Sequence, residues 1–449
     1  MSHETSDDTP APAPGADRRL AELAARGVIL RGSPGEIHID PSLPLNAIAP
    51  GAVLERARLY GDCRVGAGAV LHDATLRDSR VGPGCRLGRG GPATLDRALL
   101  GAKVELTAGM ITESVVLSGA SLGFGSCLRR NVLIDTGATL GQSNDLKNTI
   151  LGAATLLGSS TNFCDITALG GRPRRPVDQT EIGSGVIHFN FGIHGKKWGS
   201  WVGSIGSVFL RSPRSFLGGN TSLIGPVIVP DGTISLVGSQ LREPLERHHE
   251  GQELINAPGP AGFRKAFEPA VYGPLAPRLR ASCEIIGRLR ALDAWFRVIR
   301  ARLGEPEETC EGARGIIQRI IAERVDWLER LMAELPDSIA RLRTLPSRRY
   351  EARARSQQAF LDDWRQTDRA VRLRDPGCQD TTRALELAFT EGLERALADA
   401  EGSGEPPEAS PAALFARLAA LPDSLVAAGV RWLEAIVAES VEGLPGAEQ

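Results

Sequence analysis

The clearest pattern in this chain is a ladder of aliphatic residues that recur at every sixth position. The regular part of the ladder consists of Val116, Leu122, Leu128, Ile134, Leu140 and Leu146. Upstream the ladder runs in steps of five and six residues, and downstream it continues to Leu169. This spacing matches neither the 3.6-residue period of a helix nor the two-residue period of an ordinary strand.

A small residue follows many ladder residues, as in Val81-Gly82 and Leu122-Gly123. Small side chains and glycine permit the sharp corner that would end a short strand there. Each hexad then forms one flat face of a three-sided coil of about 18 residues, and the aliphatic residues stack inside it. The pattern therefore predicts a mainly β fold, a left-handed parallel β-helix. A sandwich of ordinary strands would instead require alternation with a period of two.

The ladder has two main interruptions. The first, Gly170 to Gln179, is rich in proline and arginine, which favours an exposed loop. The second, Phe191 to Trp201, reads FGIHGKKWGSW and is basic and aromatic. Loops on a rigid scaffold often carry function, so we expect the functional residues near these two segments.

The composition changes after Pro244, where glycine becomes sparse and Arg, Ala, Leu and Glu become frequent. Amphipathic spacing predicts helices near 278–302, 311–334, 348–368, 379–399 and 411–441, with a break near Leu421-Pro422. The resulting domain prediction is a tail at 1–17, a helix and lead-in at 18–44, the β-helix at 45–243, a linker at 244–274 and an all-α domain at 275–449.

Charge and composition narrow the function classes. The hydrophobic content is 42% and the formal net charge is −2, which gives no global bias toward nucleic acid or anionic membranes. The first residues lack the features of a signal peptide, and no apolar run reaches the roughly 18 to 20 residues that span a bilayer. We therefore expect a cytoplasmic protein with no nucleic-acid or membrane partner. The seven cysteines form no CxxC pair, so we expect reduced thiols and no metal site.

The stretch Ile182 to Asn190, the basic loop after it and the renewed ladder at Ile224 to Val227 carry a family resemblance. They resemble the acetyltransferase domain of bifunctional N-acetylglucosamine-1-phosphate uridyltransferases. The resemblance is closer still to bacterial β-helix proteins related to UDP-N-acetylglucosamine pyrophosphorylase, and it covers roughly residues 45–243. It implies a homotrimer that binds acetyl-CoA or another acyl-CoA, together with a small-molecule acceptor, between adjacent prisms. Residues 1–45 cannot hold a nucleotidyltransferase domain, so pyrophosphorylase activity is not expected.

The resemblance also assigns candidate residues. It implies that Asn190 contacts the substrate amine, and that Lys196 and Lys197 approach the cofactor. The general-base histidine of the relatives is missing, and Ser160 lies nearest its place, before Asn162. Transfer to an amine normally needs a base with a pKa near neutrality.

Other candidates come from side-chain chemistry. His194, in the basic loop, and His188, expected at a coil interior or corner, are the candidate bases. The side chain of Asn190 could instead join an amide ladder at a solenoid corner. Arginine suits phosphate, and the tryptophans could either stack on an adenine or sugar ring or merely hold the loop in place. The full prediction is His194, His188 and Asn190 for catalysis, Lys196, Lys197, Arg211, Arg214 and Trp198 for the cofactor, and Asn162, Ser160, Arg172, Arg174 and Trp201 for the substrate.

Three functions remain open at this point. The first is an acyltransferase that moves an acyl group from coenzyme A, or a similar activated donor, to an amine or hydroxyl of a sugar, nucleotide sugar or amino-acid-like acceptor. The second is a noncatalytic β-helix that binds a sugar nucleotide or acts as a scaffold. The third is a metal-dependent lyase, which would need His188, His194 and a third histidine to converge.

Overall fold

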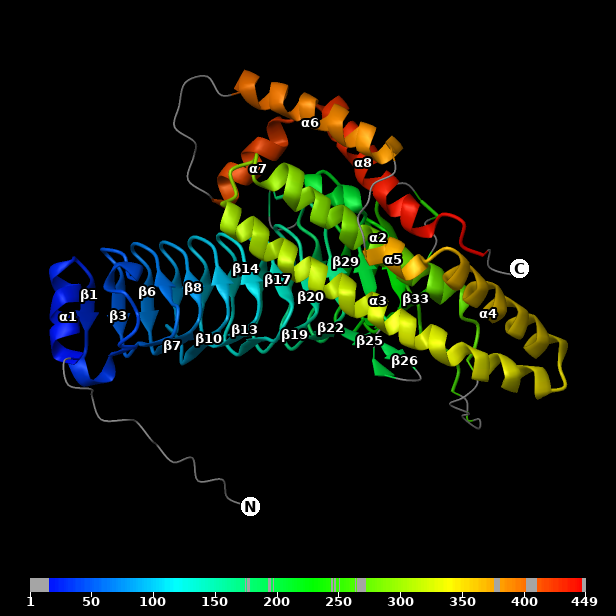
Figure 1. The fold of residues 1–449 in the computed structure, drawn as a ribbon, viewed down its shortest axis with the longest axis horizontal. Helices are drawn as coiled ribbons and strands as arrows, with labels where there is room; N and C mark the ends of the chain where they lie inside the picture. Colours follow the sequence, from blue (N-terminus) through cyan, green and yellow to red (C-terminus); the bar gives the residue numbers. More distant parts are fainter. Residues whose placement is uncertain are drawn as a thin grey trace, which may run out of the picture.

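A parallel β-solenoid followed by a helical region makes up the chain in the computed structural model (Figure 1). The structure describes residues 16–173, 175, 178–192, 195–196, 198–243, 245, 248–249, 251–262, 264, 272–374, 380–400 and 410–445. The expected fold class, a β-helix with an all-α region after it, is confirmed.

Three parallel sheets form the faces of the prism, and every third strand along the chain belongs to the same sheet through most of its length. Sheet A has twelve strands: β1 (Ile29–Arg31), β3 (Val53–Glu55), β6 (Val70–His72), β9 (Arg86–Leu87), β12 (Glu105–Leu106), β15 (Ser121–Leu122), β18 (Thr139–Leu140), β21 (Leu156–Leu157), β24 (Glu181–Ile182), β29 (Phe216–Leu217), β32 (Thr233–Ser235) and β34 (Glu253–Ile255). The strands therefore extend beyond the expected 45–243 at both ends.

Sheets B and C complete the prism. Sheet B has eleven strands: β2 (His38–Ile39), β4 (Arg58–Tyr60), β7 (Ala74–Arg77), β10 (Ala93–Asp96), β13 (Gly109–Thr112), β16 (Ser126–Leu128), β19 (Asp145–Lys147), β22 (Asn162–Cys164), β25 (Ile187–Phe189), β30 (Ser222–Ile224) and β33 (Gln240–Arg242). Sheet C has nine: β5 (Arg64–Val65), β8 (Arg80–Val81), β11 (Leu99–Leu100), β14 (Val115–Val116), β17 (Val132–Ile134), β20 (Thr149–Leu151), β23 (Ile166–Ala168), β28 (Ser200–Val202) and β31 (Val227–Val229). A separate antiparallel hairpin, β26 (Phe191–Gly192) with β27 (Gly195–Lys196), forms part of the second expected interruption.

The aliphatic ladder fills the prism, as predicted. Leu122 pairs with Leu140 in sheet A, and Leu128 pairs with Leu146 in sheet B. These four side chains are at most 2% exposed. Interior burial of this kind, repeated coil after coil, supplies the core of the solenoid while main-chain groups pair with the coils on either side.

The helical region follows the prism. Its helices are α2 (Ala276–Trp295), continued by a π-helical turn (Phe296–Arg300), α3 (Glu307–Thr344), α4 (Arg348–Gln366), α5 (Arg369–Arg374), α6 (Asp380–Ala400), α7 (Pro411–Ala420) and α8 (Asp423–Val441), while α1 (Ala16–Ala25) precedes the prism. The expected break at Leu421-Pro422 separates α7 from α8. Within the described residues no single helix could cross a bilayer by length and hydropathy, and only α7 with α8, bent by 102°, pass such a test together.

Helix α3 runs well past residue 334, where we expected it to end, although Pro336 lies inside it. Proline in a helix interior costs about 3 kcal/mol. Leu335, Ile339 and Leu342 are at most 2% exposed in this part of the helix, which lies against α4. Tertiary packing of the last turns therefore outweighs the local preference to stop.

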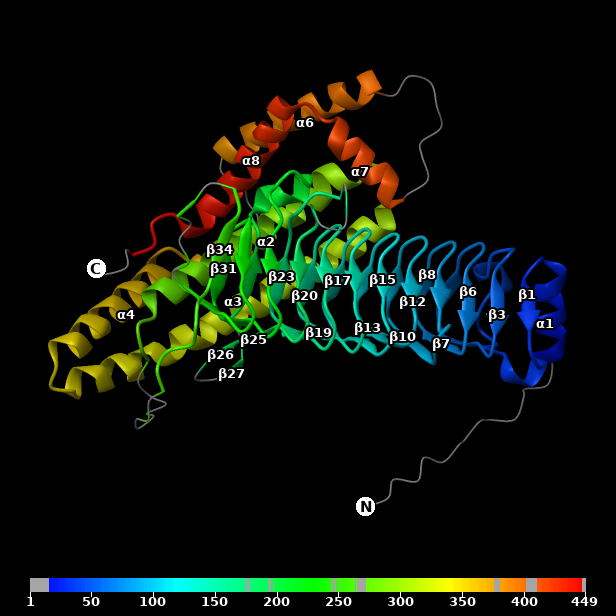
Figure 2. The same cartoon turned by 180° about the vertical axis from the view of Figure 1, so that it is seen from behind.

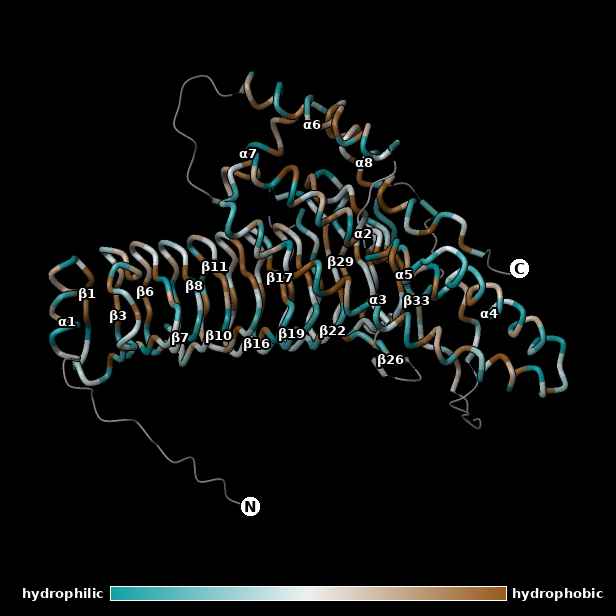
Figure 3. The backbone as a smooth tube through the Cα atoms, viewed as in Figure 1, coloured by the Kyte–Doolittle hydropathy of each residue, from teal (hydrophilic) through white to brown (hydrophobic). Residues whose placement is uncertain are grey.

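The helices α2 and α3 cover one face of the prism, the outer face of sheet C (Figures 1 and 2). Along this face the outer residue of six covered strands is apolar, and that of β23 is the buried Thr167. The six apolar residues are Leu99, Val115, Leu133, Ile150, Trp201 and Ile228. In the coils before Leu99 the corresponding residues are Arg64 and Arg80, and Arg80 forms an ion pair with Glu308 at the start of α3. Figure 3 shows the matching alternation of apolar and polar residues along the helices.

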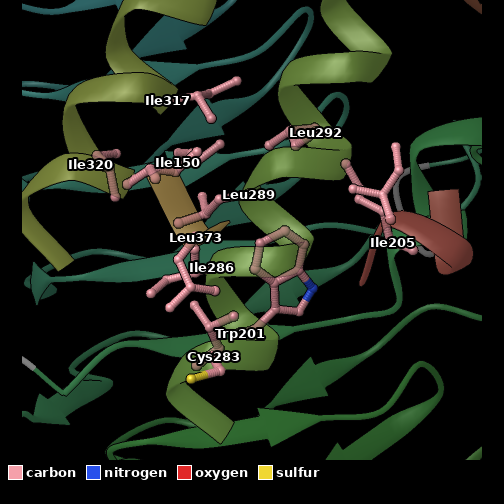
Figure 4. Packing of buried hydrophobic residues seen from close by; sticks show 14 of the residues in the cluster. Ile150, Trp201, Ile205, Cys283, Ile286, Leu289, Leu292, Ile317, Ile320 and Leu373 are labelled. Carbon is pink, nitrogen blue, oxygen red and sulfur yellow. The ribbon is translucent and has the colours of Figure 1, made fainter. Parts of the chain in front are cut away.

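The contact between the two parts is a single hydrophobic core. Ile150 and Trp201 of sheet C meet residues of α2, α3 and α5 in this core, as Figure 4 shows. A Cβ added to Gly312 of α3 would lie 2.6 Å from a methyl carbon of Leu99, so a larger residue here would require the Leu99 side chain to move. The prism and the helical region are thus packed together rather than loosely joined.

Candidate functional site

A column of polar residues stacks at successive corners between sheets B and C. Asn131, Asn148 and Asp165 have φ values of 60°, 47° and 69°, and asparagine and aspartate tolerate this left-handed conformation. The Asn131 amide donates to Asn148 at 3.1 Å, and the Asn148 amide donates to Asp165 at 3.2 Å. The Asn190 amide donates to the other Asp165 carboxylate oxygen at 3.0 Å. Asn190 is 8% exposed. It therefore belongs to an amide ladder at a solenoid corner, which is the alternative position considered for it from the sequence.

Helix α3 covers this column with charged side chains. Glu323 accepts hydrogen bonds from Asn131 and Asn148 at 3.2 and 2.9 Å. Arg324 donates to the main-chain oxygen of Asp165 at 3.0 Å and is itself buried. Asn190 is the residue to which the family resemblance gives a role in substrate binding. In this structure its side-chain amide is bound to the carboxylate of Asp165 instead.

His188 lies in the interior register of sheet B. It pairs with Leu223 in the next strand, and Leu223 is fully buried. The Nδ1 of His188 lies 2.5 Å from the main-chain oxygen of Cys164, and its Nε2 lies 2.9 Å from the Ser200 hydroxyl. Ser200 in turn accepts from the amide of Val227. A neutral ring that donates from Nδ1 and accepts at Nε2 satisfies all of these groups.

Burial lowers the pKa of His188 from 6.5 to about 4, against the opposite effect of its hydrogen bond to Cys164. Its two ring nitrogens are both engaged, and Ser200 is fully buried. The geometry therefore suits a structural histidine and does not favour His188 as the general base.

Both candidate tryptophans lie under the helical region instead of in an exposed loop. Trp198 is 3% exposed and meets Trp327 edge to face, with ring centroids 4.4 Å apart. Trp201 is fully buried on the outer face of sheet C, with Arg288 of α2 over its ring. Neither ring is open to an adenine or sugar, because protein side chains already occupy their faces.

The candidate arginines have protein partners. Arg211 donates to the main-chain oxygens of Leu418 and Leu421, and so binds the carboxyl end of α7. Arg214 lies 3.5 Å from Glu181, and Arg172 donates to the main chain of Arg211. Such contacts fix α7 and the first interruption on the prism.

The side chains at four of the predicted positions lie outside the part of the chain that the structure describes. His194, Lys197 and Arg174 lie outside the described residues, as does the side chain of Lys196, whose main chain pairs with Phe191 in the hairpin. Their proposed roles stay predictions.

Ser160 and Asn162 are exposed, beside the outer face of sheet B. We call the outer residues of three neighbouring strands there the open face: Asp145, Lys147, Asn162, Cys164, Ile187 and Phe189. Asp145 pairs with Asn162, and Asn162 pairs with Ile187, so these side chains stand side by side.

The open face combines charge with exposed apolar surface. Arg129 binds Asp145 at 2.7 Å and lies 3.6 Å from the Cys164 sulfur. Ile187 and Phe189 are 51% and 53% exposed, and Phe191 of the hairpin, 46% exposed, has its ring 5.9 Å from that of Phe189. Contiguous exposed apolar groups next to polar ones mark binding surfaces.

Sequence reasoning identified Asn162 but missed most of the open face. A signal was present, because the two neighbours of each ladder residue in a strand point outward. Asp145 and Lys147 flank Leu146, and Ile187 and Phe189 flank His188 in the same way. Among the described residues no group of three or more His, Cys, Asp or Glu side chains could hold a metal ion.

Comparisons with known proteins agree with the resemblance seen in the sequence. No family model matches the chain. The bifunctional protein GlmU of Trichormus variabilis is 27% identical over 228 residues, which is 50% of this chain and 42% of the relative. GlmU of Streptococcus thermophilus is 26% identical over 213 residues, which is 47% of this chain and 38% of the relative. The chain thus spans less than half the length of these relatives, and the similarity, with the solenoid, fits a hexapeptide-repeat, acetyltransferase-like protein.

Proposed function

We propose that this chain is an acyltransferase that acts at the open face. The proposed reaction moves an acyl group from acetyl-CoA, or a similar activated donor, to an amine or hydroxyl of a sugar, nucleotide sugar or amino-acid-like acceptor. The similarity to GlmU proteins supports acyltransferase-type function in general. The observation that supports the open face as the site is the exposed apolar group formed by Ile187, Phe189 and Phe191 beside Asn162.

The chemistry needs few groups. The acceptor nitrogen or oxygen attacks the thioester carbonyl and loses a proton, the carbon–sulfur bond breaks, and the thiol of coenzyme A leaves with a proton. Asn162 can donate to and accept from the acceptor. Asp145 is engaged in an ion pair with Arg129, so His194 stays the proposed base.

A trimer would complete the proposed site. Exposed apolar side chains on one prism favour burial against a neighbouring copy, with donor and acceptor between them. In this proposal Lys196 and Lys197 reach toward the phosphates of coenzyme A. We propose that the reaction takes place in the cytoplasm.

Release of free thiol from acetyl-CoA tests the proposal. Purified full-length chain is incubated with acetyl-CoA and a panel of amino sugars, sugar phosphates and nucleotide sugars. We expect acceptor-dependent thiol release, with kcat/KM lowered by about tenfold in Asn162→Ala because an orienting hydrogen bond is lost. The matched control is Asn46→Ala, which removes an exposed amide at the other end of the prism and should leave the rate unchanged.

A noncatalytic role is the second candidate, and Ser160 at the expected place of the histidine favours it. The same protein is then examined by thermal shift with acetyl-CoA, coenzyme A and UDP-N-acetylglucosamine. A shift without thiol release would support binding alone. No shift with any ligand and no release with any acceptor would contradict both functions.

A further inference from the structure

The corner between β9 and β10 is longer than its neighbours. A single residue, Asp73, separates β6 from β7, whereas Gly88 to Pro92 separate β9 from β10. Gly88 has a φ of 80°, and a Cβ there would lie 1.7 Å from the main-chain oxygen of His72. Only glycine permits this close turn, which carries Arg89 over the outer face of sheet A.

A pocket of about 400 Å³ lies under this corner loop. Its floor is formed by Glu55, Val70 and His72 of β3 and β6, and its walls include Arg31, Arg86 and Arg89. We call this space the arginine pocket. It is on sheet A in the first coils, whereas the open face is on sheet B near the hairpin.

The arginines of the pocket are poorly neutralised. No hydrogen bond or ion pair within the described part of the chain engages the side chains of Arg31 and Arg89. Arg86 contacts Glu105 at 3.2 Å, but these side chains are 61% and 53% exposed, so the pair is weak. Three arginines therefore line a space with one lining carboxylate, that of Glu55.

The floor is held in one arrangement by a local network. Arg56 lies 2.7 Å from Nε2 of His72, and the His72 Nδ1 lies 3.3 Å from Glu55. Because arginine can only donate, Nε2 must accept and Nδ1 carries the proton toward Glu55. The other charged side chains of the lining are three arginines and the single carboxylate of Glu55.

We propose that the arginine pocket binds a dianionic phosphate group, that of a phosphomonoester or of a diphosphate. The net charge of the lining matches a dianion, and guanidinium groups form paired hydrogen bonds with phosphate oxygens. The pocket volume of about 400 Å³ is sufficient for a diphosphate. This site is separate from the proposed acyl transfer and does not depend on it.

Calorimetric titration of the full-length protein with inorganic pyrophosphate tests the site, with inorganic phosphate and UDP in separate arms. We expect saturable binding of pyrophosphate, weakened about tenfold in Arg89→Gln and in Arg31→Gln, because each change removes a charge-assisted contact. Glu55→Gln should strengthen binding, since it removes the opposing charge. Preference for phosphate over pyrophosphate would assign the monoester, and preference for UDP would assign a nucleoside diphosphate.

Two further variants distinguish a defined binding site from nonspecific attraction to positive charge. Arg18→Gln removes the same charge from an exposed place on α1 and should leave binding unchanged. Gly88→Ala keeps every charge but displaces the corner loop, so it should weaken binding of pyrophosphate, with circular dichroism as the check on folding. Equal loss in Arg18→Gln and Arg89→Gln, or no saturable binding of any probe, would overturn the proposal.

Discussion

Replacement of Arg300 by methionine should lower the free energy of unfolding by about 3–5 kcal/mol, because it leaves two buried carboxylates without their cation. Arg300 is 1% exposed at the contact between the π-helical turn and the prism. Its Nη2 lies 3.0 Å from Asp135, 2.9 Å from Glu305 and 2.6 Å from the Thr136 hydroxyl. Urea denaturation followed by tryptophan fluorescence measures the change.

Arg302→Met is the matched control for this prediction. Arg302 pairs with Glu394 at 3.3 Å, and both side chains are more than one third exposed, so its loss should cost no more than about 1 kcal/mol. The triple variant Arg300→Met, Asp135→Asn, Glu305→Gln removes all three charges and should regain part of the loss. Equal effects of Arg300→Met and Arg302→Met would show that the buried cluster contributes no more than a surface pair.

Acidification from pH 6.5 to pH 4 should remove about 3 kcal/mol of stability through His188 alone. Burial lowers the pKa of this histidine to about 4 from 6.5. Between these values the unfolded chain binds a proton that the folded chain does not, so stability falls as the pH falls. The contribution of His188 to the free energy of unfolding is fully present above pH 6.5 and is lost below pH 4.

Carboxylates also titrate at the acid end of this range, so the measurement is a difference between two proteins. In His188→Leu the side chain becomes the one found at the equivalent position of β30, Leu223. We expect a flatter dependence of the urea midpoint on pH in this variant, even if its stability at neutral pH is lower. Parallel curves for the two proteins between pH 6.5 and pH 4 would contradict a neutral, buried His188.

The hexad ladder was sufficient to predict the prism, since its period excludes other folds and its residues lie in the interior. The two interruptions were also visible, because proline, arginine and glycine replace the aliphatic residues there. The position of His188 followed from the same register, six residues after Ile182. Local spacing therefore specifies what lies inside each coil.

What covers the outside of the coils could not be predicted in the same way. Trp198 and Trp201 were expected to be available to ligands because a basic loop surrounds them in the sequence. In the structure, Val202 continues the interior ladder, so Trp201 points outward and packs under α2. The burial of Asn190 likewise depends on Asp165 and on a helix more than a hundred residues away, which no local pattern contains.

A sequence signal for this cover did exist. Strands such as Val132–Ile134 are apolar at every position, and a strand with two apolar sides must be buried on both. The change from Arg64 and Arg80 to Leu99 and Val115 marks where the cover begins. The identity of the covering helices still required the three-dimensional arrangement, since several amphipathic segments follow the prism.

The outer face of sheet C, where α2 and α3 cover it, also limits how this protein can change in length. Each coil advances the prism by about 4.8 Å, whereas α3 advances by about 1.5 Å per residue, and Gly312 is matched to Leu99 by close contact. Insertion or deletion of one coil under the helices would shift every later outer residue out of its place on α2 and α3. Arg80 of β8 is also tied to α3 by its ion pair with Glu308, so variation in coil number among homologues should be confined to the coils before Arg80.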